Sequence, residues 1–204
     1  MRPRIAPLTF LFLFASSTLT LCFIATPANR AFTLAASKFD PPISLPSDEP
    51  LSVKFKRAVI FQRSGDNASA LREYEIFLQA AESCDAPPEA CAEAQANAGA
   101  ACLKMGDFKN ARKYLELALE VRDDLGTANV NLALVAMAEA GRENDAIAGE
   151  SKLRNAEFHC RVVLDAADKE GRGTPVERET IKAAQCLLDD VESILQKMGK
   201  VEFL

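Results

Sequence analysis

The chain has 204 residues, of which 49% are hydrophobic and 26% are charged, and its formal net charge at pH 7 is −5. This length allows one domain of ordinary size and an additional tail. The acidic balance argues against nucleic acid as a partner, because duplex binding depends on clustered Lys and Arg that neutralise phosphates. Many alanines and few alternating β-branched runs favour an all-α fold.

The N-terminus predicts a targeting segment. Arg2 and Arg4 precede an apolar run over residues 8–25, and small residues follow it. This order is typical of a cleaved secretory signal peptide, which we expect over residues 1–31. The loss of Arg2, Arg4 and Arg30 from the 24 basic residues would deepen the net charge to −8. The run is also near the ~20 residues that span a bilayer, so a retained membrane anchor is the alternative.

Residues 32–50 form a second N-terminal segment. Residues 32–39 hold no acid and are rich in small and hydroxyl side chains, as transit peptides are. The Ala31–Phe32 junction resembles the two-part presequences of algae with secondary plastids, which implies a plastid destination. Secretion, periplasmic export and membrane anchoring are the alternatives. Prolines 41, 42, 46 and 50 predict an extended linker before the globular part.

A helical hairpin is predicted over residues 88–122. Small and apolar residues recur every three or four positions up to Met105 and again from Phe108. Gly106 and Asp107 separate the two runs, since glycine tolerates a positive φ and aspartate caps the next helix. The small residues expected where the two helices cross are Gly99, Ala100, Ala101 and Ala111. Such a hairpin stays half-exposed alone and needs neighbours.

The turn of this hairpin has two further copies. Gly65, Gly106 and Gly141 are each followed, five positions later, by an alanine. These alanines are Ala70, Ala111 and Ala146. The glycine spacings, 41 and 35 residues, are close to the ~34-residue period of helix-turn-helix arrays. The pattern resembles the tetratricopeptide repeat (TPR) family over residues 51–154.

The resemblance implies about three antiparallel helix pairs, stacked in a short right-handed superhelix over residues 51–170. Some positions depart from the family: Lys54, Arg57 and Glu150 stand where large apolar residues are usual, and no copy ends with the family's proline. The expected helices are 51–63, 67–82, 88–104, 108–122, 127–140 and one of about 25 residues from 144 onward.

A last helix is predicted over residues 174–199. Thr174, Pro175 and Glu177 have capping-box spacing, and an apolar stripe follows them. Such a helix usually covers the open end of a stack. The stripe also has coiled-coil spacing, so a docking or dimer face is the alternative.

The sequence indicates no catalytic centre. His159 is the only histidine, and Cys160 beside it lies on a predicted apolar stripe. No phosphate loop, dinucleotide glycine pattern, HExxH or paired CxxC is present. We therefore expect no enzymatic activity, cofactor or metal, and an enzyme that uses His159 and Cys160 is the least favoured alternative.

Two of the six cysteines bracket a proline-containing loop. Cys84 and Cys91 are seven positions apart, on either side of Pro87 and Pro88. In an oxidising compartment they could close the loop as a disulfide, and in a stroma they would be free thiols or a redox-responsive pair.

The family resemblance implies a partner-binding groove on the first helices of successive pairs. The residues it places there are Phe55, Val59, Asn97, Ala100, Leu103, Lys104, Asn131 and Val135. Asn97 and Asn131 are the most informative, because an amide can both donate to and accept from the backbone of an extended peptide. Some family members clamp the acidic tail of chaperones, but only Asn97 matches that clamp, so we expect none here.

The sequence thus predicts a non-enzymatic scaffold or adaptor that binds a segment of another protein, with an assembly factor in a plastid as the favoured setting. The alternative is a membrane-anchored structural subunit of a larger complex. We expect a monomer or a subunit of a complex.

Overall fold

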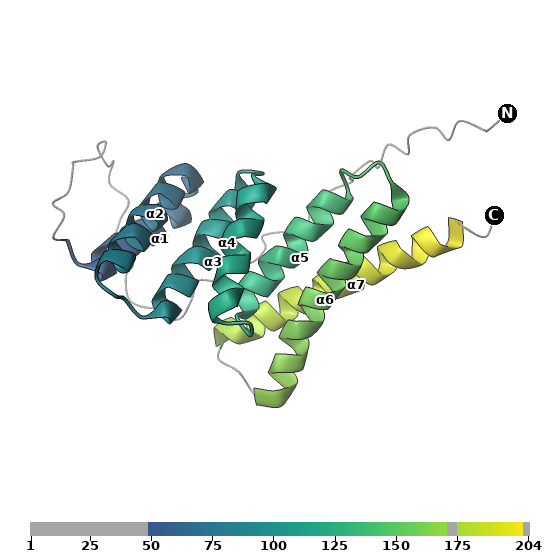
Figure 1. Ribbon diagram of the computed structural model, residues 1–204. Helices are drawn as coiled ribbons and strands as arrows, with labels where there is room; N and C mark the ends of the chain where they lie inside the picture. The colour runs from purple at the N-terminus through teal and green to yellow at the C-terminus, as the bar shows by residue number, and fades with distance from the viewer. Residues whose placement is uncertain (1–48, 171–174, 202–204) are drawn as a thin grey trace.

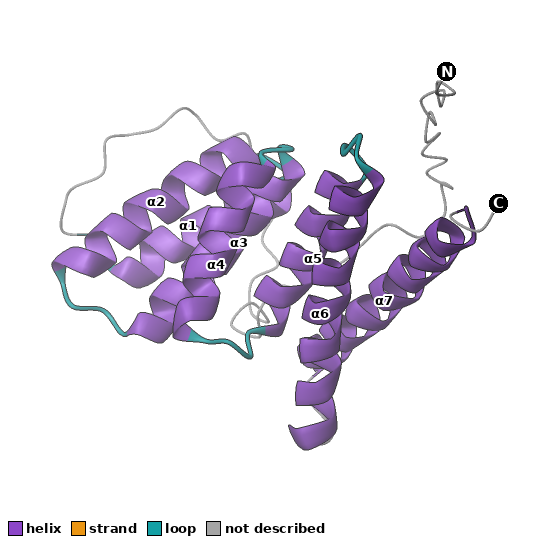
Figure 2. Ribbon diagram, turned by 45° about the vertical axis from the view of Figure 1, so that its right-hand side comes forward, coloured by secondary structure: helices purple, strands orange, loops and turns teal. Residues whose placement is uncertain are grey.

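The computed structural model describes residues 49–170 and 175–201, and all regular elements in these two ranges are α-helices (Figure 2). They are α1 (Leu51–Ser64), α2 (Asn67–Ser83), α3 (Pro88–Lys104), α4 (Phe108–Val121), α5 (Gly126–Ala140), α6 (Ala146–Glu170) and α7 (Pro175–Val201). The prediction of an all-α fold is confirmed. The predicted signal peptide, the transit-like segment, nearly all of the linker and Thr174 lie outside the described residues.

The helices pack in chain order. α1 packs on α2, α3 on α4 and α5 on α6, and each pair contacts the next through α2–α3 and α4–α5. α3 also contacts α5, and α7 lies against both α5 and α6 (Figure 1). The expected helix ends agree with the observed ones within two residues, and α6 has the predicted length of 25 residues.

Three hydrophobic clusters follow from this order. The first joins α1, α2 and α3 around Tyr74 and Phe77. The second joins α3, α4 and α5 around Leu115 and Leu132. The third joins α5, α6 and α7 around Cys160 and Val191. Neighbouring clusters share a helix, α3 or α5. Each helix pair therefore buries its apolar side chains together with the adjacent pair.

The first two turns have the predicted chemistry. Gly65 and Gly106 have φ angles of +85° and +77°, which glycine adopts without a Cβ clash. Asp66 and Asp107 then cap α2 and α4, since each carboxylate accepts a hydrogen bond from the backbone N–H three residues on, at 3.0 and 3.1 Å. Hydrogen bonds from the side chain and then the backbone N–H of Ser69 hold the pKa of the Asp66 carboxyl below its ordinary range, and those from the backbone N–H and then the side chain of Asn110 do the same for Asp107.

The third turn is longer than the first two. The prediction that Ala146 takes the place that Ala70 and Ala111 have in their helices is therefore wrong. Gly141 has φ −68°, and the chain continues to Asp145 before α6 begins. The N–H of Gly149 donates to the carbonyl of Asp145 at 2.9 Å, as Ala70 does to Asp66 and Ala111 to Asp107. Ala146 is therefore exposed at the start of α6, and the buried Gly149 occupies the place that Ala70 and Ala111 occupy in their helices.

The crossing of α3 and α4 is as close as the small residues predict. Gly99, Ala101 and Ala111 are buried, whereas Ala100 is half-exposed. A Cβ atom added at Gly99 would lie 2.6 Å from Cγ of Leu115, which is shorter than any ordinary contact. The two helices therefore approach each other at a distance that only glycine permits at this position.

Candidate functional site

Two of the residues predicted to line the groove are part of the core. Val59 is 7% exposed among α1, α2 and α3, and Val135 is 0% exposed among α3, α4 and α5. The expectation that they face a partner is wrong, because each is on the side of its helix that packs against neighbouring helices. These two aliphatic side chains therefore add almost no apolar surface to the accessible face.

Phe55 also has a mainly structural place. Its ring packs edge to face on Tyr74 and Phe77 of α2, with ring centroids 5.8 and 5.5 Å apart. Such aromatic pairs add to the stability that burial alone gives. Phe55 is half-buried, so only part of its ring remains accessible.

The other predicted residues lie at the surface of α3 and α5. Asn97, Ala100, Leu103 and Asn131 are half-buried, and Lys104 is exposed. Partial burial lowers the pKa of Lys104. Since α3 and α5 are in contact, these side chains belong to two adjacent helices.

α3 and α5 each carry one stripe of four residues that lie on the same side of their helix. Steps of four, three and four residues link Glu93, Asn97, Ala100 and Lys104 in α3, and Thr127, Asn131, Leu134 and Ala138 in α5. Corresponding members are 34 residues apart, and none is fully buried. We call these eight residues the α3–α5 face.

Sequence reasoning missed four members of this face, Glu93, Thr127, Leu134 and Ala138. The missing signal was the helical step from Asn97 and Asn131, since residues four before and three after share a side of the helix. Lys56, 41 residues before Asn97, is exposed at the corresponding position of α1.

The surface amides differ from a third asparagine that is structural. Asn129 is 2% exposed, and its Nδ2 donates to the carbonyls of Asp123 and Leu125 at 3.0 and 3.3 Å. Within the described residues, the Asn97 and Asn131 side chains have no hydrogen-bond partner. Asn129 therefore fixes the start of α5, whereas Asn97 and Asn131 keep their donors and acceptors for a ligand or for water.

His159 is held by the same Asn129. Because the amide nitrogen of Asn129 is occupied by the two carbonyls, its Oδ1 faces Nδ1 of His159 at 2.9 Å, and Nδ1 must carry the proton. Burial, and then the nearby Arg112, lower the pKa of His159. The neutral ring borders a shallow hollow of about 430 Å³ between α4 and α6, whose floor is Leu132.

Cys160 is separated from this hollow. It is buried in the cluster of α5, α6 and α7, and burial raises the pKa of its thiol to about 11. A thiol without solvent access and with a raised pKa is a poor nucleophile. The structure does not place His159 and Cys160 as a base and nucleophile pair.

Cys84 and Cys91 flank the loop between α2 and α3. Both are free thiols; Cys84 is exposed and Cys91 is half-buried. Burial, followed by the nearby Cys84, raises the pKa of Cys91. Cys91 also lines a hollow of about 640 Å³ that reaches from α2 to Tyr114 of α4. Whether the two thiols form a redox pair stays a prediction.

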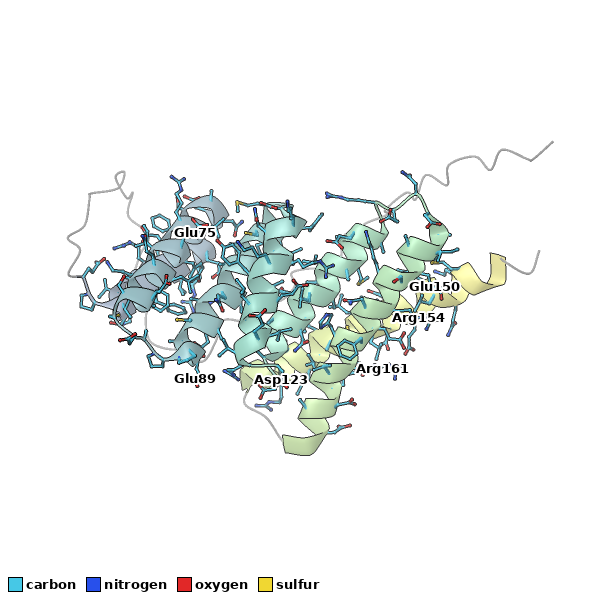
Figure 3. The ribbon with its side chains drawn as sticks, viewed as in Figure 1. Glu75, Glu89, Asp123, Glu150, Arg154 and Arg161 are labelled. Atoms are coloured by element: carbon cyan, nitrogen blue, oxygen red, sulfur yellow. The ribbon has the colours of Figure 1, made fainter. Side chains whose placement is uncertain are left out.

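Polar contacts fix the helices that carry these features. Tyr114 of α4 donates to Glu75 of α2 at 2.7 Å, and Arg112 of α4 pairs with Glu139 of α5 at 2.8 Å. Arg161 of α6 pairs with Glu192 of α7 at 3.1 Å; Figure 3 labels Glu75 and Arg161. These links join α2 to α4, α4 to α5 and α6 to α7, and the hydrogen bond between Asn129 and His159 joins α5 to α6.

Residues 49–170 and 175–201 contain neither a candidate metal site nor a candidate membrane span. No group of three or more His, Cys, Asp or Glu side chains could hold a metal ion. None of the helices there is long and apolar enough to cross a bilayer.

No protein-family model matches the chain, and no curated protein matches it.

Proposed function

We propose that the chain is a non-enzymatic scaffold of TPR-like helix pairs, which binds an extended segment of another protein on the α3–α5 face. The observation that supports this most directly is the pair Asn97 and Asn131. The two amides occupy corresponding positions of adjacent helices, half-buried and without side-chain partners among the described residues.

The chemistry of the face suits an extended backbone. A strand-like segment presents N–H and C=O groups along its length, and an amide side chain can satisfy one of each. Ala100 offers apolar surface beside Asn97, and Leu134, which packs on the cluster of α5, α6 and α7, keeps part of its side chain accessible. The α3–α5 face carries charge of both signs, from Glu93 and Lys104, and Lys56 is exposed at the corresponding position of α1.

The contribution of each contact is modest. A hydrogen bond exchanged for one to water contributes about 0.5–1.5 kcal/mol net, and the buried apolar area is small. We therefore expect micromolar rather than nanomolar binding, with partner choice set by the spacing of the amides.

The test is affinity capture with immobilised protein, followed by quantitative mass spectrometry. The Asn97→Ala/Asn131→Ala variant should lose a specific partner that the unchanged protein retains, because both backbone contacts are removed. The matched control is Asn144→Ala, an exposed amide in the turn before α6. Equal recovery of all partners by the double variant and the control would contradict the proposed face.

We place this scaffold in a plastid as an assembly factor, on the presequence pattern of residues 1–39. Imaging of residues 1–50 fused to a fluorescent protein in an algal host tests the destination. Label in the endomembranes or the medium would contradict it. N-terminal sequencing of the mature protein separates this proposal from the anchored structural subunit, since a retained Met1 favours the anchor.

A further inference from the structure

The hollow between α4 and α6 is the feature that the proposed function does not use. Its volume is about 430 Å³, and its floor is Leu132 of α5. The polar side chains that line it are Arg112, Glu116 and Glu120 of α4 and Asn155 and His159 of α6. None of these residues belongs to the α3–α5 face, so the two surfaces are independent of each other.

His159 presents a fixed hydrogen-bond acceptor to this hollow. Its Nδ1–H donates to Oδ1 of Asn129 at 2.9 Å, and the buried Asn129 is itself held by two backbone carbonyls. The other ring nitrogen, Nε2, therefore carries a lone pair, because the partner of one nitrogen sets the tautomer of the ring. Within the described residues, Nε2 has no hydrogen-bond partner. Burial and then Arg112 lower the pKa of His159, which keeps the ring neutral at pH 7.

The wall opposite His159 carries carboxylates with spare hydrogen-bonding capacity. Glu120 is exposed and has no ion-pair partner in the part of the chain that the structure describes. The Glu116 side chain is 56% exposed and lies 3.6 Å from Arg112, which also pairs with Glu139 of α5 at 2.8 Å. One cation and three carboxylates give this wall a formal charge of −2. Its donors are therefore already paired, whereas several of its acceptors are not.

Apolar surface accompanies these polar groups. Leu119 of α4 is half-buried and lines the hollow above Leu132. Phe158 of α6 is 61% exposed, and its ring stands edge to face against His159 with the ring centroids 5.4 Å apart. A long side chain that enters the hollow could therefore lay its methylene groups on apolar surface while its polar end reaches the acceptors.

We propose that the hollow between α4 and α6 binds an arginine side chain of a partner protein. The free groups, Nε2 of His159 and the carboxylates of Glu116 and Glu120, are all acceptors and come from two helices. A guanidinium has five N–H donors in one plane and no acceptor, so it can bridge the two walls. A lysine ammonium donates from one atom only, and an anionic ligand would meet a wall of charge −2.

The test is long-range proton–nitrogen NMR of the isotope-labelled full chain, in which His159 is the only histidine and gives a single imidazole spectrum. N-acetylarginine methylamide should shift the Nε2 signal in a saturable way with a millimolar Kd, because one side chain makes few contacts. N-acetylcitrulline methylamide has nearly the same shape without the charge and should bind at least about tenfold more weakly. Glu120→Gln should weaken the arginine derivative about threefold or more. The matched control is Glu82→Gln, since Glu82 is exposed and, like Glu120, is the next-to-last residue of its helix.

Four results would overturn the proposal. An Nε2 signal that stays unchanged at tens of millimolar of the arginine derivative would mean that the hollow does not bind it. Equal binding of the citrulline derivative would mean that charge is not recognised, and equal binding of N-acetyllysine methylamide would mean that the hollow does not select a guanidinium. The same affinity in Glu120→Gln as in Glu82→Gln would mean that the carboxylate wall takes no part.

Discussion

The two ends of the described helices are finished in different ways. At the C-terminal end, α7 covers α5 and α6 with buried aliphatic side chains, among them Leu187 and Val191. At the N-terminal end, α1 leaves Val53 and Ile60 exposed and relies on the Arg57 ion pairs.

This difference shows that the same helical stripe can be a core or a surface, depending only on what precedes it. Ala94 and Val53 occupy corresponding positions, yet one is fully buried and the other is not. The C-terminal end has α7 as a cover, whereas Val53 and Ile60 of α1 stay exposed among the described residues. The stability of the two ends should therefore respond differently to substitution and conditions.

The largest effect is expected at the covered end. Leu187→Ala should lower the free energy of unfolding by about 2–5 kcal/mol, because it leaves a cavity between α7 and its neighbours. Urea denaturation followed by circular dichroism measures this. Ile147→Ala, at an exposed position, should change it by less than about 0.5 kcal/mol. Similar values for the two variants would mean that α7 does not close the core.

A disulfide between Cys84 and Cys91 would stabilise only the N-terminal half of the described helices. Oxidation of Cys84 and Cys91 by thiol–disulfide exchange with oxidised glutathione should raise the free energy of unfolding by about 2 kcal/mol, since it closes a short loop. Cys84→Ser should abolish the difference between oxidised and reduced protein, and Cys186→Ser on α7 should not. If mass spectrometry of the unreduced, glutathione-treated protein finds both thiols alkylatable, the pair does not form.

The middle of the stack should be sensitive to a single methyl group. Gly99→Ala should cost about 1–2 kcal/mol, because the strain against Leu115 exceeds the gain in helix propensity. Gly199→Ala in α7, where nothing lies within 4 Å, should instead stabilise by up to about 1 kcal/mol. Thermal melts of both variants decide this, and equal signs would contradict the close crossing.

The smallest effect is a pH dependence from His159. Its pKa is lowered in the folded state, so the unfolded chain binds more protons as the pH falls through the ordinary histidine pKa of about 6.5. Stability should be complete above that value and decline below it, by a fraction of the ~1.4 kcal/mol per pH unit that full linkage gives. His159→Gln should flatten this region. Asp66 and Asp107, with lowered pKa values, should still cause a loss at more acidic pH in both proteins.

Helix positions were predictable because their signals are local. Gly65, Asp66, Gly106 and Asp107 each determine a turn or cap through their own backbone and side chain, and apolar periodicity supplies the rest. The third turn failed because Gly141 suggested the same geometry, whereas the three extra residues up to Asp145 shift α6 in register.

The candidate site was less predictable because it depends on helix rotation. Neighbouring residues in a helix point about 100° apart, so Val135 faces α3 while Leu134 is partly accessible. The polarity of a residue does not decide between such positions. Asn129 and Asn131 have the same side chain, and only the packing of α6 and the preceding loop makes one of them structural.

The lengths of the last two helices bear on how such a protein could become longer. α6 and α7 have 25 and 27 residues, against 14 to 17 for α1 to α5, and α6 extends past the end of α5 (Figure 2). The long α6 and α7 do not present to a following helix pair the kind of surface that α3 and α4 present to α5. Gene duplication could therefore add units of the α3–α4 kind upstream of α5, but not beyond it, and the C-terminal half sets the direction of growth.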